Sequence, residues 1–170
     1  MEKAIFAVLS YAIMSEKIKK YRLGPLGSLM DEYERALREL QQVLRSVTAD
    51  DYIRISNPGS PDPDCFSVQT IVWHTISAGY GYATSIGNAI GVARTRPEIP
   101  LLPKDEALDK LDEMFRYSLE TFEGKWDMGE EKMYTTTIKT SWSEYDIDSM
   151  LEHAIVHILR HRRQIERLVF

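Results

Sequence analysis

The sequence predicts an all-α fold, a four-helix bundle with an N-terminal helical extension. Apolar residues recur at spacings of three and four along four separate stretches. Short clusters of proline, glycine and other turn-forming residues separate these stretches. A chain of 170 residues is long enough for one domain with a sizeable core. We therefore predict an extension over 1–23 and a bundle domain over 24–170.

The first bundle helix is expected over 28–46. Its apolar stripe consists of Leu29, Tyr33, Leu37, Leu40, Leu44 and Val47. The run NPGSPDPD at 57–64 is a dense cluster of turn formers and predicts a loop. A second helix should start at 66–67, with Ser67 as its N-cap, and reach about residue 91. Its four glycines indicate close packing, or room left beside the helix.

A third helix is expected over 105–123, followed by a short extended segment or hairpin arm within 133–142. The last helix should start at Ser143, which forms a Ser-x-x-Asp capping pattern with Asp146, and run to the C-terminus. Its apolar seam consists of Ile147, Leu151, Ala154, Ile158, His161, Ile165 and Leu168.

Composition excludes several classes of protein. A net charge of −5 provides no basic surface for nucleic acid. The apolar run at 4–14 is shorter than the ~20 residues of a membrane span and lacks the features of a signal peptide, so we interpret it as a helix. The single Cys65 excludes an internal disulfide and fits a reducing compartment. We therefore expect a cytoplasmic protein without a membrane or nucleic-acid partner.

Three of the four histidines lie in the decapeptide EHAIVHILRH, at 153, 157 and 161. On a helix with ~100° per residue, His157 and His161 differ by ~40° in direction and by one turn in height. Both rings can therefore approach one point beside the helix. His161 also occupies a position of the apolar seam. His153 is rotated a further ~40° and points least inward of the three.

Two neutral imidazoles at i, i+4 aim two lone pairs at the same point, which a borderline metal ion accepts. A third ligand should come from another helix, and His74 is the remaining histidine. Three histidine ligands would leave a coordination position for water or substrate, as in catalytic sites. The pattern also allows a second interpretation, in which the histidines are core residues satisfied by hydrogen bonds.

Three segments resemble a known family: LMDEYERALRELQQVL at 29–44, FSVQTIVWH at 66–74 and HILRHRRQI at 157–165. The chain resembles the DinB-like family of metal-binding helical bundles, which includes YfiT-like proteins, from about residue 26 to 168. One departure is that Arg163 stands where the family motif has glycine. The resemblance implies four helices in an up-down arrangement with a long crossover, often assembled as a homodimer.

The resemblance places a divalent metal (Ni, Zn, Fe or Mn) on His74, His157 and His161. His153 and Gln164 are candidates for supporting the ligands rather than for binding the ion. We expect a metal-dependent enzyme that acts on a small molecule, similar to a thiol-S-transferase, through a metal-activated low-molecular-weight thiol or water. The reaction would be transfer or hydrolysis. A non-catalytic metal-binding or stress-response bundle protein is the alternative.

Other residue types are interpreted as structural. Cys65 has no base near it in sequence, and we expect an incidental thiol. Asp62 and Asp64 lack the spacing of a calcium loop and are interpreted as turn formers. Trp73 is expected in the core or at a dimer interface. The sequence identifies no carboxylate near the three histidines, and hence no catalytic base.

Overall fold

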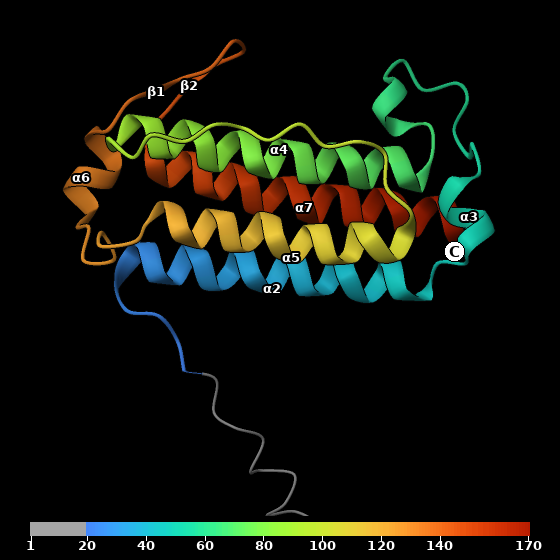
Figure 1. The fold of residues 1–170 in the computed structure, drawn as a ribbon, viewed down its shortest axis with the longest axis horizontal. Coiled ribbons are helices and arrows are strands. Elements are labelled where there is room, and N and C mark those ends of the chain that lie inside the picture. Colours follow the sequence, from blue (N-terminus) through green and yellow to red (C-terminus); the bar gives the residue numbers. More distant parts are fainter. Residues whose placement is uncertain (1–19) are drawn as a thin grey trace, which may run out of the picture.

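The computed structural model describes residues 20–170 (Figure 1). Four long helices form a bundle: α2 Gly24–Ser46, α4 Val68–Ala89, α5 Lys104–Thr121 and α7 Ile147–Val169. The shorter elements are helix α3 Ala49–Ile53, the 3₁₀ turn η1 Pro63–Cys65, helix α6 Glu130–Thr135, and strands β1 Ile138–Lys139 and β2 Glu144–Tyr145. The predicted all-α bundle is confirmed. The helix expected over 4–14 lies outside the described residues, and residues 20–23 are not helical.

The four helices run up, down, down and up (Figure 1). α2 and α7 share one direction, and α4 and α5 share the other. The chain therefore returns along the whole length of α4, through residues 90–103, before α5 begins. α4 packs against both α5 and α7, and α2 packs against the same two helices. This arrangement places α4 directly beside α7, the two helices that carry all four histidines.

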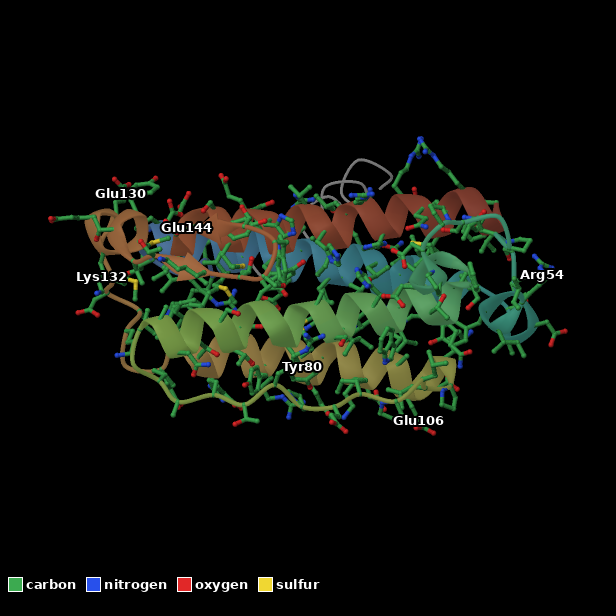
Figure 2. The ribbon with its side chains drawn as sticks, turned by 90° about the horizontal axis from the view of Figure 1, so that it is seen from above. Arg54, Tyr80, Glu106, Glu130, Lys132 and Glu144 are labelled. Atoms are coloured by element: carbon green, nitrogen blue, oxygen red, sulfur yellow. The ribbon has the colours of Figure 1, made fainter. Side chains whose placement is uncertain are left out.

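The core lies along the stripes that the periodicity predicted. In α2 the side chains of Tyr33, Leu37, Leu40 and Leu44 are buried, whereas Leu29 is only partly buried. Charged side chains such as Glu106 and Glu130 project outward from the bundle (Figure 2). Among residues 20–170, no helix combines the length and the apolar character needed to cross a membrane.

Two predicted helix starts are wrong: α2 begins at Gly24 rather than at residue 28, and α7 begins at Ile147 rather than at Ser143. α7 does not start at Ser143, because Asp146 caps it: the Asp146 carboxylate accepts from the Ser149 amide, and the Ser149 hydroxyl accepts from the Asp146 amide. Ser143 instead lies in the turn that joins β1 to β2. The short hairpin arm expected within 133–142 is confirmed: β1, Ile138–Lys139, pairs antiparallel with β2, while the residues before it form helix α6 and a loop.

The glycines of α4 permit close packing. A Cβ atom at Gly79 would overlap the Met114 side chain of α5, and one at Gly87 would lie 2.7 Å from Cγ of Arg94. Both approaches are too short for a real side chain, so these glycines let α5 and the crossover lie against α4. The atoms nearest to a Cβ at Gly81 would be those of the Arg96 guanidinium, at 3.6 Å, which is ordinary van der Waals contact.

Trp73 joins the crossover to α4. Its indole N–H donates to the Ile99 carbonyl at 2.6 Å, and its side chain is partly buried. This bond fixes the crossover against the helix one residue before His74.

Candidate metal centre

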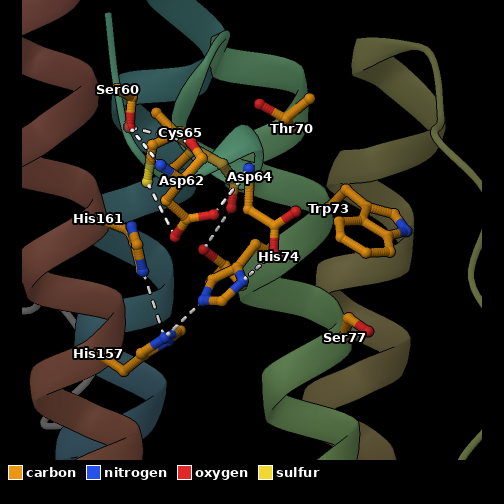
Figure 3. Close-up of polar contacts among 12 residues, drawn as sticks. Ser60, Asp62, Asp64, Cys65, Thr70, Trp73, His74, Ser77, His157 and His161 are labelled. Atoms are coloured by element: carbon orange, nitrogen blue, oxygen red, sulfur yellow. Dashed lines mark hydrogen bonds and ion pairs between the residues drawn. The ribbon is translucent and has the colours of Figure 1, made fainter.

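Three histidine rings from two helices meet between α4 and α7 (Figure 3). Nε2 of His74 lies 3.1 Å from Nε2 of His157, and Nε2 of His161 lies 3.2 Å from that same atom. The three candidate ligand atoms all lie within 4.8 Å of one another. The structure thus brings together the three histidines singled out from the sequence.

Local structure determines how these rings face one another. The capping box of Ser67 and Thr70 starts α4 seven residues before His74. Asp146 starts α7 in the register that puts His161 into its apolar seam, where it is 6% exposed. His157 lies one turn earlier and borders the seam, so it is only partly buried.

Two polar side chains hold the outer nitrogens of the cluster. Nδ1 of His74 lies 2.9 Å from a carboxylate oxygen of Asp64, and Nδ1 of His161 lies 2.9 Å from the amide oxygen of Gln164. Both partners accept hydrogen bonds, so each histidine carries its proton on Nδ1. The lone pair on each Nε2 therefore points toward His157.

These tautomers leave more lone pairs than protons at the centre. Nε2 of His157 faces two acceptors and can donate at most one proton to them. At least one pair of nitrogens therefore faces lone pair to lone pair. A cation among them would satisfy all three atoms, and three imidazoles are a common donor set for zinc and similar ions. The donor set fits a divalent metal.

Burial favours the uncharged forms of His157 and His161. Burial, together with the neighbouring histidines His161, His74 and His153, lowers the pKa of His157 to about 3. Burial also lowers the pKa of His161, although the bond to Gln164 partly opposes this. Neutral imidazole is the form that binds a metal.

His153 lies outside the cluster. Its ring is T-shaped against Tyr82 and Tyr145, at centroid distances of 5.3 and 5.5 Å, and stacks at 6.0 Å on His157. These contacts place it beside the three histidines, against two tyrosines. A role in supporting the ligands stays a prediction.

Two cavities flank the histidines, one of about 720 Å³ and one of about 520 Å³. Three residues line both of them: His74, His157 and Arg160. The larger cavity is also lined by Asp64, Trp73, Tyr82, Arg96, Trp142 and His153. The smaller cavity is also lined by Asp62, Cys65, His161, Arg163, Gln164 and Arg167.

The structure corrects the interpretation of Asp64. It was expected only to form a turn, yet its carboxylate contacts His74. Asp62 does act as a turn former, because its side chain caps η1 and accepts from the Asp64 amide at 3.0 Å. The sequence signal that could have indicated this contact is the acidic loop that lies just before the helix of His74. Cys65 Sγ lies 3.8 Å from an Asp62 carboxylate oxygen.

The fold and the site together define the class of this protein. It is a four-helix bundle with a candidate three-histidine metal centre between two of its helices. Comparison with known families matches residues 32–165 to the DinB superfamily. The chain therefore belongs to the DinB superfamily, as its motifs predicted. No curated protein and no solved structure matches the chain. Superfamily membership and the histidine cluster are compatible with metal binding.

The lowered pKa of His157 predicts a pH-dependent stability of the metal-free protein. The unfolded chain takes up a proton at His157 below about pH 6.5, whereas the folded chain does not until about pH 3. The free energy of unfolding should therefore decrease as the pH is lowered from about 6.5 to about 3. Because His157 is only partly buried, we expect less than ~1.4 kcal/mol per pH unit. Urea unfolding between pH 7 and 5.5 measures this. A His157→Gln variant should show a shallower slope, and an equal slope would contradict the assignment.

Proposed function

We propose that this protein binds one divalent metal ion through His74, His157 and His161 and acts as a metal-dependent enzyme on a small molecule. The observation that carries the proposal is that His74 and His157 line two open cavities. A structural metal site is closed by its protein ligands, whereas a catalytic site keeps a position open to substrate. Access from two sides supports catalysis over a non-catalytic, metal-stabilised bundle.

The surrounding residues hold the ligands in place. Asp64 accepts a hydrogen bond from Nδ1–H of His74, and Gln164 accepts one from Nδ1–H of His161. Both Nε2 atoms therefore stay directed at the centre. The bound ion would lower the pKa of a thiol or water and so supply a nucleophile near neutral pH. One cavity could admit this nucleophile while the other admits the electrophile. Transfer from a low-molecular-weight thiol and hydrolysis both fit this arrangement.

Elemental analysis of protein purified without a nickel column tests the proposal. We expect about one divalent ion per chain, or its uptake when zinc, manganese or nickel is added. In Asp64→Asn, which loses the carboxylate on His74, zinc affinity should fall about 10- to 100-fold. Asp50→Asn is the matched control, because Asp50 is exposed on α3 and lines neither cavity. A wild-type protein that takes up no ion would overturn the proposal.

A further inference from the structure

The larger cavity carries positive charge in an acidic protein. The net charge of the chain is −5, yet the cavity is lined by two arginines, Arg96 and Arg160, and by one carboxylate, Asp64. That carboxylate is bonded to His74. The histidines there add no compensating negative charge, so the local balance has the opposite sign to that of the whole chain.

In the part of the chain that the structure describes, neither arginine has a carboxylate partner. Within residues 20–170, no acidic oxygen lies within 4.0 Å of the guanidinium of Arg96 or Arg160. Arg35 and Arg38 of α2, by contrast, pair with two acids each. The two cavity arginines therefore keep N–H donors available for a ligand.

Contacts with α4 fix the position of the Arg96 side chain. It lies on the crossover, donates to the Ser77 hydroxyl at 2.6 Å and rests over Gly81. Ser77 and Gly81 follow His74 by three and seven residues, so all three share one face of α4. Arg96 is thereby positioned on the histidine-bearing face of that helix.

Arg160 comes from the opposite wall. It follows His157 by three residues on α7, and so lies on the same face as that ligand candidate. It is exposed and lines both cavities. A ligand in the larger cavity thus meets cationic groups from two sides.

The rest of the cavity wall is largely aromatic. Trp73 and Tyr82 come from α4, and Trp142 comes from the β1–β2 turn, where its side chain is 63% exposed. The Trp142 indole N–H donates to the Tyr145 hydroxyl at 3.2 Å, which orients the ring. A volume of about 720 Å³ suits a small organic molecule.

We propose that the larger cavity selects a small organic carboxylate with a planar apolar body. Arg96 and Arg160 provide the charge that recognises the carboxylate, and the three aromatic side chains pack against the body. This inference rests on the proposed function, since it names the substrate class of that same site.

Benzoate and its neutral analogue benzamide test the proposal on metal-free protein, where the carboxylate has no ion to bind. Calorimetric titration should show benzoate binding at least about tenfold more tightly than benzamide. Benzoate should also shift the indole N–H resonances of Trp73 and Trp142 in NMR spectra. Arg96→Gln and Arg160→Gln should each weaken benzoate binding about tenfold, and Arg160→Lys should recover part of the loss.

Arg116→Gln is the matched control, because Arg116 is exposed on α5 and lines neither cavity. Equal binding of benzamide, no binding of benzoate, or an equal loss in Arg116→Gln would overturn the inference. A separate zinc titration distinguishes the two proposals. Zinc uptake without benzoate selectivity removes only the inference, whereas benzoate selectivity without metal uptake removes only the proposed metal function.

Discussion

His157→Ala should abolish stoichiometric metal binding. Nε2 of His157 lies between those of His74 and His161, so its removal takes away the atom that both of the others face. Losing a ligand should exceed the loss caused by losing its supporting carboxylate, so we expect zinc affinity to fall by at least roughly a hundredfold. Elemental analysis and zinc titration of the purified variant measure this. Any thiol-dependent turnover should disappear with the metal.

His153→Ala is the control for this experiment. His153 is also an imidazole of α7, one turn before His157, but it contacts two tyrosines and lies outside the three-nitrogen cluster. Metal content should therefore stay near that of the wild type. Retention of metal in His157→Ala, or equal loss in both variants, would contradict the assignment of ligands. Turnover that survives His157→Ala would contradict the proposed mechanism.

Leu37→Ala should strongly destabilise the protein and leave the metal centre intact. Leu37 is 0% exposed in the middle of α2, a helix that carries none of the three histidines. Truncating a fully buried leucine removes apolar contacts and leaves a cavity, which costs about 2–5 kcal/mol. For a chain of this size the melting temperature should fall by about 4–20 °C. Urea and thermal unfolding of metal-free protein measure both quantities.

Leu101→Ala is the matched control, because Leu101 is 54% exposed on the crossover. Its effect on the free energy of unfolding should stay within about 0.5 kcal/mol. Zinc affinity measured well below the melting temperature should be unchanged in Leu37→Ala. A large loss of affinity there would show that α2 shapes the site rather than only supporting α4 and α7.

Local patterns were sufficient for most of the helices. The stripe of α2 and the seam of α7 each consist mainly of apolar residues at spacings of three and four. This spacing puts them on one face of the helix, and that face is the buried one. The start of α7 was mispredicted because Ser143 and Asp146 both head an acceptable capping pattern. Tertiary packing decided between them, since the β1–β2 pairing uses the residues just before Asp146.

The candidate site was only partly readable in the chain. His157 and His161 share a helix face because of the helical period alone, and His74 was the remaining histidine, at a position that the family motif also indicated. Asp64 could not be assigned, because nothing local specifies that the loop before α4 folds back onto His74, ten residues away. Arg96 and Trp142 lie on connections whose paths depend on the bundle they cross.

The sequence by itself determined that the protein is a helical bundle, which faces of its long helices are buried, and that His157 and His161 share one face of the last helix. These properties depend on spacing within single helices, where 3.6 residues per turn sets direction. Only the tertiary structure decided that α4 lies antiparallel beside α7, which acid supports His74, and that two arginines and an aromatic wall line one cavity with His74 and His157. Those contacts join residues distant in the chain, and their geometry exists only once the helices have packed.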